Sequence, residues 1–283
     1  MTTIEIVNEK ILDQLKKGVI PWKKPWIGPR KAYSIASGRD YSLLNQLLLG
    51  LPGAYGTYEQ WKRLGGQVRK NEKGHFVTFW KMVEKKTIDQ NGKENLERYP
   101  VLRYYIVFHQ SQITGVSIEP ENMVMPPDPV EAADKVIAGY IDREKIKYTE
   151  SEESDKAFYN PLSDEVVIPA RKYFSESSAS SMYSVIFHEL AHSTGHSSRL
   201  DRPGLKKVSF GSEIYSAEEL VAEIASCYIL ESLGISTDLT IQMSASYIDG
   251  WSKAIRSDGN MIVKAAPAAE KAAKLILGTC KIA

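Results

Sequence analysis

Apolar side chains in the first 112 residues recur at helical spacing in some stretches and alternate with polar ones in others. Spacing of i, i+3 and i+4 is typical of an amphipathic helix, and strict alternation is typical of a half-buried strand. The pattern predicts helices at 4–17, 42–51 and 57–64. It predicts strands at 67–70, 75–81 and 101–109. We therefore expect this half to be α+β, with a small antiparallel sheet.

Longer stretches with helical periodicity dominate the rest of the chain. They predict helices at 130–143, from the serine-rich segment 175–181 to Ser193, at 216–233, and over much of the last 45 residues. Two interruptions of the final stretch are expected, at residues 258–260 and at Pro267, because proline lacks the N–H that a helix needs. Strands are predicted at 145–149 and 165–169. The expected fold is mainly helical with a small antiparallel sheet.

Four prolines between residues 113 and 129 indicate a linker, so we expect domains at 1–112 and 130–283 joined by residues 113–129. Charge supports this division. Residues 1–112 hold 19 Lys and Arg against 10 Asp and Glu, whereas the remaining residues hold 17 against 25. A basic half that is also rich in aromatic residues, joined to an acidic half, suggests two domains with different partners.

The composition also bears on the cellular compartment. No apolar run approaches the roughly 20 residues of a membrane-spanning helix, and the first residues lack the features of a secretory signal. The two cysteines, Cys227 and Cys280, show no motif spacing, which fits a reducing compartment. We therefore expect a cytoplasmic protein with no membrane partner.

The strongest chemical signal is a pair of histidines, His188 and His192, four residues apart on a predicted helix. At this spacing both imidazoles project from one face and can bind a single cation. Glu189 lies beside them, where it can hold a water and act as a catalytic base rather than as a ligand. The alternative is a pair of structural histidines beside a solvated glutamate. The apolar neighbours argue against it, because unpaired imidazoles are costly to bury.

A third ligand is expected from the helix predicted at 216–233. Glu219 and Glu223 share one face of that helix, while Glu218 points about 100° away. We predict that Glu219 binds the metal and that Glu223 accepts a hydrogen bond from a ligating histidine, with the reverse assignment left open. His196 is expected beside the site, in a cap or loop contact. Zn²⁺ suits these donors best, although they also suit Mn²⁺ and Ni²⁺.

The basic half carries the ingredients of a single-stranded-DNA site, which are cationic groups for phosphates and aromatic faces for bases. The alternative is that the aromatic residues fill the core while the lysines lie in water. The candidate contact residues are Trp22, Lys23, Lys24, Trp26, Arg39, Tyr41, Asn45, Trp61, Lys62, Arg69 and Lys70.

With these residues identified, the chain resembles the ArdC-type antirestriction proteins of conjugative plasmids and other mobile elements. The resemblance spans nearly the whole chain. It is carried by residues 20–26, 38–45, 58–70, 188–202, 217–223 and 245–251. It implies a single-stranded-DNA-binding domain followed by a zincin-like metallopeptidase domain.

Three hypotheses follow. The first is a protein that binds single-stranded DNA and shields incoming DNA from host nucleases. The second is a zinc-dependent endopeptidase with Glu189 as general base, in which the strand at 165–169 pairs with an extended peptide or protein substrate. The third is a DNA-binding protein whose metal is structural or regulatory, with no proteolysis.

Overall fold

The computed structural model describes residues 1–23, 31–88, 94–118, 126–174, 179–205, 216–235 and 245–279. The chain divides into two compact units, Met1–Glu9 with Lys31–Pro120, and Lys10–Arg30 with Glu121–Ala283. Helix α1 (Thr3–Lys16) contributes to both. The α+β class predicted from the sequence is confirmed. The division differs from the predicted boundaries, because the C-terminal part of α1 and the segment after it, Lys10–Arg30, group with the second unit.

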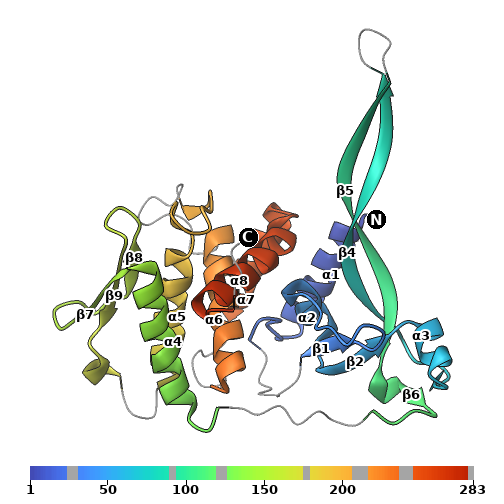
Figure 1. The fold of residues 1–283 in the computed structure, drawn as a ribbon, viewed down its shortest axis with the longest axis horizontal. Helices are drawn as coiled ribbons and strands as arrows, with labels where there is room; N and C mark the ends of the chain where they lie inside the picture. The colour runs from blue at the N-terminus through green and yellow to red at the C-terminus, as the bar shows by residue number, and fades with distance from the viewer. Residues whose placement is uncertain are drawn as a thin grey trace. The chain divides into compact units, whose positions relative to one another are not determined.

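A four-stranded sheet of order β1-β2-β5-β4 organises the first unit. The strands β1 (Ala32–Ser34) and β2 (Gly53–Gly56) are parallel, and β5 (Glu94–His109) is antiparallel to both β2 and β4 (His75–Ile88). Beyond β2, β4 and β5 continue as a long two-stranded ribbon (Figure 1). Both strands are longer than predicted, because cross-strand pairing extends them through residues with no apolar alternation.

Two short helices of the first unit lie close to their predicted positions. These are α2 (Leu43–Leu49) and α3 (Tyr58–Arg63), and Thr57 caps α3 through a reciprocal contact with Gln60. Strand β3 (Gln67–Val68) pairs with β6 (Ile113–Thr114). The first residues of the predicted linker therefore belong to a sheet of the first unit.

Two residues predicted to contact DNA lie in the interior of the first unit instead. Trp61 is fully buried, and its Nε1 donates to the carbonyl oxygen of Phe108 at 2.9 Å. Asn45 is also buried and clamps α2 to β4. Its Oδ1 accepts from Thr78 N at 2.7 Å, and its Nδ2 donates to Thr78 O at 2.9 Å. Both side chains satisfy internal groups, so the prediction that they bind DNA is corrected.

The second unit contains a three-stranded sheet of order β7-β9-β8. Strand β9 (Glu165–Pro169) is parallel to β7 (Lys147–Ser151) and antiparallel to β8 (Phe158–Asn160). The sheet is therefore mixed rather than antiparallel, and β8 was not predicted. Strand β7 pairs with the whole of β9, and β8 pairs with Glu165–Val167. Both edges of β9 are occupied over these three residues, so the expectation that an extended peptide pairs with the whole of residues 165–169 is wrong.

Helices make up most of the second unit. They are α4 (Pro129–Glu144), α5 (Ala179–Ser193), α6 (Ala217–Leu233), α7 (Ala245–Ser257) and α8 (Met261–Ile276). Helix α5 packs against β8 and β9 and against α6, which in turn packs on α8 (Figure 1). None of the helices in the described residues has the length and apolar character needed to span a bilayer.

The predicted break at Pro267 does not occur, because α8 runs through it. An interior proline costs a helix about 3 kcal/mol. Burial of a face that includes Ala265, Ala266 and Ala269 offsets this cost. Tertiary packing therefore outweighs local propensity here.

Replacing Trp61 with alanine should lower the free energy of unfolding by about 3–5 kcal/mol, because it empties a buried site. Trp80 is 55% exposed, so Trp80→Ala is the matched control and should change stability by less than about 0.5 kcal/mol. Urea unfolding followed by circular dichroism measures both. Equal stability of the two variants would contradict the core assignment of Trp61.

Candidate metal centre

Helix α5 presents the two histidines of the sequence motif side by side. His188 Nε2 lies 3.1 Å from His192 Nε2. The ring centroids are 4.7 Å apart, and the ring planes are 81° apart. Other side chains of α5 anchor it in the core, because Ile186, Phe187 and Leu190 are fully buried. This anchoring fixes the direction in which both imidazoles point.

Glu219 approaches the histidine pair from α6. Its position in the first turn is fixed by Ser216, whose side chain accepts from Glu219 N at 3.2 Å. Glu219 Oε2 lies 3.3 Å from His188 Nε2, and Glu219 Oε1 lies 3.5 Å from His192 Nε2. The ligand atoms of the three residues all lie within 4.8 Å of one another.

These separations fit one tetrahedral cation. Donors held at zinc–nitrogen and zinc–oxygen distances in a tetrahedron lie about 3.3 Å from each other. The two imidazole nitrogens lie 3.1 Å apart, and each lies 3.3 or 3.5 Å from a different oxygen of the Glu219 carboxylate. Two imidazoles and a carboxylate are also donors that zinc and related divalent ions accept. The sequence prediction of these three residues as a set is therefore matched by their geometry.

The electrostatics of the centre favour a positive charge. Burial opposes the charged form of His192, but contacts with Glu218 and Glu219 outweigh burial and raise its pKa to about 10. Burial likewise opposes the charge of Glu219, yet contacts with His188 and His192 hold its pKa below the usual range. A divalent cation bound between the histidines and Glu219 would supply the positive charge that the neighbouring carboxylates favour.

Glu218, predicted to point away, is the residue that supports His192. Its Oε1 lies 3.5 Å from His192 Nδ1, the ring nitrogen opposite the candidate ligand atom. A carboxylate at that nitrogen fixes the orientation of a ligating imidazole and raises its basicity. Glu218 is itself buried and accepts from Arg202 Nε at 3.0 Å and from Arg202 Nη2 at 2.5 Å.

Arg202 ties this support to the end of α5. Its guanidinium donates to Thr194 Oγ1 at 2.5 Å and to the carbonyl oxygen of Ala191 at 2.8 Å. A Cβ at Gly195 would lie 2.9 Å from Arg202 Nη2, so only glycine fits there without a shift. Sequence reasoning missed the Glu218–Arg202 pair. The available signal was a glutamate in the first turn of a largely apolar helix, together with an arginine shortly after the histidines.

Glu223 does not have the predicted contact with a ligating histidine. It accepts from Trp22 Nε1 at 3.3 Å, lies 3.5 Å from Lys23 Nζ, and accepts a short hydrogen bond from the Tyr247 hydroxyl. The reason is the rotation of α6, which turns Glu218 toward the histidines and Glu223 toward the segment after α1. The role predicted for Glu223 is therefore filled by Glu218.

Trp22 and Lys23, both predicted to contact DNA, belong to the second unit. Trp22 is buried, with its ring edge-to-face on Trp251 at 5.9 Å between centroids. Lys23 Nζ lies 4.5 Å from the centre of the Tyr247 ring. These contacts correct the expectation that Trp22 stacks on a base. Lys24 and Trp26 lie outside the described residues.

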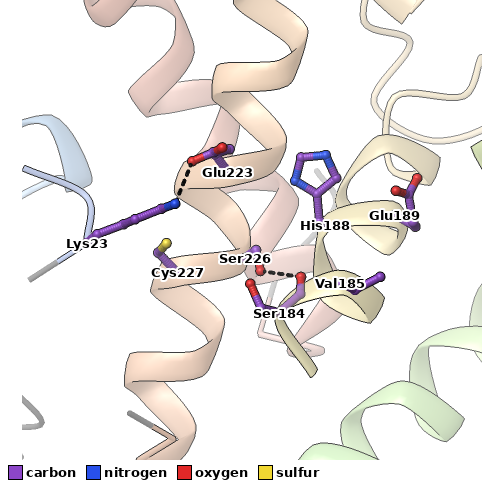
Figure 2. A pocket seen from close by; sticks show the side chains of 8 residues that line it. All are labelled: Lys23, Ser184, Val185, His188, Glu189, Glu223, Ser226 and Cys227. Carbon is purple, nitrogen blue, oxygen red and sulfur yellow. Dashed lines mark hydrogen bonds and ion pairs between the residues drawn. The ribbon is translucent and has the colours of Figure 1, made fainter. Parts of the chain in front are cut away.

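A cavity of about 210 Å³ adjoins His188. It is lined by His188, Glu189 and residues of α5 and α6, with Lys23 on a further side (Figure 2). His188 and Glu189 both line this space, so the predicted base lies at a cavity next to the candidate ligands. His196 is not part of it, because its Nδ1 lies 2.8 Å from Ser198 Oγ in the turn after α5.

The other predicted DNA contacts lie on the first unit. Arg39, Lys62 and Lys70 are exposed. Arg69 is exposed but paired with Glu72 at 2.6 Å. Tyr41 is half-buried and packs edge-to-face on Tyr55. The predicted set therefore does not form one surface, since it is divided between the interior and exterior of two units.

Replacing Glu218 with glutamine should weaken metal binding by about 10- to 100-fold, because the His192 ring loses its charged acceptor. Glu223→Gln removes the same charge five residues along the same helix and should leave the affinity close to that of the unchanged protein. Isothermal titration with Zn²⁺ measures both, with circular dichroism as the check on folding. A larger loss for Glu223→Gln than for Glu218→Gln would show that the supporting carboxylate has been misassigned.

Two families of known domains match the chain in succession. The N-terminal domain of anti-restriction factor ArdC matches residues 1–108, and a zincin-like metallopeptidase matches residues 136–268. Two proteins of Escherichia coli named DNA primase TraC are 34% and 36% identical over 94% and 96% of this chain. The chain spans only 19% and 27% of the length of these relatives.

Solved structures match over the full length. The metal-free crystal structure of the antirestriction ArdC protein from the R388 plasmid has a TM-score of 0.73 and 32% identity, covering 99% of this chain and 98% of that one. The Mn(II)-bound structure of that protein has a TM-score of 0.72 and 30% identity, covering 100% and 99%. This chain therefore belongs to the ArdC family of antirestriction proteins, with an ArdC-type N-terminal domain followed by a zincin-like domain.

Proposed function

We propose that His188, His192 and Glu219 form a catalytic divalent-metal centre that hydrolyses peptide bonds, with Zn²⁺ as the ion. The observation that carries the proposal is the approach of the three ligand atoms to within 4.8 Å of one another, beside a cavity that Glu189 lines. A catalytic zinc site has three protein ligands and leaves a position for water or substrate. The Mn(II)-bound ArdC structure makes Mn²⁺ the first alternative ion to test.

Each residue has a distinct part in this reaction. When bound, the metal supplies Lewis-acid polarisation of the scissile carbonyl and lowers the pKa of a water. Glu189 takes the proton from the attacking water and returns it to the leaving amine. Glu218 holds the His192 ring in one orientation, and Arg202 holds Glu218.

The rival account is a structural metal. Structural zinc sites are closed by four protein ligands. Among the described residues, the metal-ligating cluster here has three members, and a cavity lies next to it. These observations favour a catalytic role over a structural one.

We further propose that the first unit binds single-stranded DNA and thereby shields incoming DNA from host nucleases. The supporting observation is that the first unit, Met1–Glu9 with Lys31–Pro120, holds 13 Lys and Arg against 10 Asp and Glu. The match of residues 1–108 to the N-terminal domain of an anti-restriction factor also supports this proposal. A basic surface attracts the phosphate backbone without reading its sequence.

Glu189→Gln should retain the metal and lose turnover, because the amide keeps the size of the side chain but cannot accept the proton. Metal content is measured by elemental analysis, and turnover by cleavage of a mixed peptide library. Loss of cleavage together with retained metal is the expected result. Peptide cleavage that persists in this variant would remove Glu189 from the mechanism. If the unchanged protein cleaves nothing and metal removal only lowers its melting temperature, the metal is structural.

Binding of single-stranded DNA should weaken steeply with salt. With four phosphate contacts the affinity should fall roughly 50-fold between about 50 and 200 mM salt, since the logarithmic slope is about −0.7 per contact for a single strand. Fluorescence anisotropy with a labelled oligothymidine measures this. A flat response over that range would exclude an electrostatic DNA site.

A further inference from the structure

The ribbon formed by β4 and β5 carries an unusual number of exposed apolar side chains. Large exposed apolar groups that gather on one element mark an interaction surface more often than scattered ones do. The members on this ribbon are Trp80, Met82, Leu96, Tyr99, Tyr104, Tyr105 and Ile106.

The pairing register assigns these side chains to two faces. Directly paired residues share a face, and so do residues two apart on one strand. Phe79 pairs with Arg103, Lys81 with Val101, and Val83 with Tyr99. Tyr105 lies two residues from Arg103, so it belongs to the same face. We call Phe79, Lys81, Tyr99, Arg103 and Tyr105 the ribbon face.

Aromatic and cationic groups alternate along the ribbon face. At one end Phe79 and Tyr105 are stacked, with centroids 4.4 Å apart and planes 3° apart, and Tyr105 is 55% exposed. Arg103 lies opposite Phe79, Lys81 follows, and Tyr99 lies at the other end of the row. The order along the face is therefore aromatic, cationic, aromatic.

The two cations of the ribbon face are not neutralised. Both are exposed, and neither Lys81 nor Arg103 has an ion-pair partner among the residues that the structure describes. The acidic side chain described on this face is Glu97, whose register partner is Lys85. On the opposite face the Arg98 guanidinium is paired with Glu84 at 2.6 Å. Lys81 and Arg103 therefore give the ribbon face a positive charge that no acidic side chain neutralises among the described residues.

We propose that the ribbon face binds single-stranded nucleic acid, with bases stacked on Tyr105 and Tyr99 and phosphates held by Arg103 and Lys81. Exposed aromatic rings beside unpaired cations are the combination that such a strand requires. Aromatic residues and arginine are common in protein interfaces as well, whereas lysine is depleted there, so Lys81 is the residue that favours nucleic acid over a protein partner. The proposal rests on the proposed DNA-binding function and places that function on residues other than Trp22, Asn45 and Trp61.

Variants of the full chain test the proposal by anisotropy with a labelled oligothymidine. Tyr105→Ala should weaken binding by roughly 5- to 150-fold, the loss of one base stack. Lys81→Gln and Arg103→Gln should each weaken binding and lower the salt slope by about 0.7. Trp80→Ala is the matched control, since Trp80 is also 55% exposed and lies on the opposite face of the same ribbon. It should bind like the unchanged protein.

The outcomes separate the two proposals. If the unchanged protein binds no oligonucleotide, DNA binding by the first unit fails, and the ribbon proposal fails with it. If the unchanged protein binds, but Tyr105→Ala and Arg103→Gln bind equally well, only the ribbon proposal is overturned. A shift from dimer to monomer in these variants, with unchanged DNA affinity, would show that the face joins two copies of the chain and would also overturn it. Because the substituted side chains are exposed, circular dichroism should show intact folding throughout.

Discussion

The packing of α5 against α6 is the contact on which the chemistry depends. Of the three candidate ligands, α5 contributes the two imidazoles and α6 contributes the carboxylate, so neither helix holds the full set. Small side chains keep the helices close, because Ala222 and Ala225 are fully buried and Ser226 Oγ donates to Ser184 O at 2.9 Å. Close approach of the helices brings Glu219 to both rings. Burial then strengthens the attraction between the negative carboxylates and any cation that they surround.

The packing of α5 against α6 also explains why the His192 ring has a carboxylate on each side. His192 is buried between Glu219, on the cation side, and Glu218, on the far side of its ring. A buried carboxylate without a partner would be strongly destabilising, and Arg202 removes that cost for Glu218. The turn after α5 is therefore part of the centre, although it contributes no candidate ligand. Its arginine fixes a carboxylate, and that carboxylate fixes a ligand.

Local features were predictable from the sequence, and features that depend on the relative rotation of elements were not. The helical spacing of His188 and His192 determines that they share a face, and helical phase made Glu219 the best third candidate. Whether Glu218 or Glu223 supports a histidine depends on how α6 is rotated against α5, which periodicity does not specify. The strands β4 and β5 were underestimated because cross-strand pairing, rather than alternation, continues them.

The basic half illustrates a related limit, because residue type alone did not distinguish the interior from the surface. Tryptophans at positions 22 and 61 are buried with their indole N–H groups satisfied, whereas Trp80 is exposed. Charge along the sequence also misplaced Lys23, which belongs to the second unit and lies beside Glu223. The exposed cations and aromatic rings of the ribbon face share a surface only because the strands pair in a particular register.

Anomalous X-ray diffraction from crystals loaded with Zn²⁺ or Mn²⁺ tests the metal centre most directly. The account predicts one strong peak per chain, about 2.0–2.2 Å from His188 Nε2, His192 Nε2 and a carboxylate oxygen of Glu219. A peak at other residues, or no peak with either metal while the two rings point into separate surroundings, would contradict it.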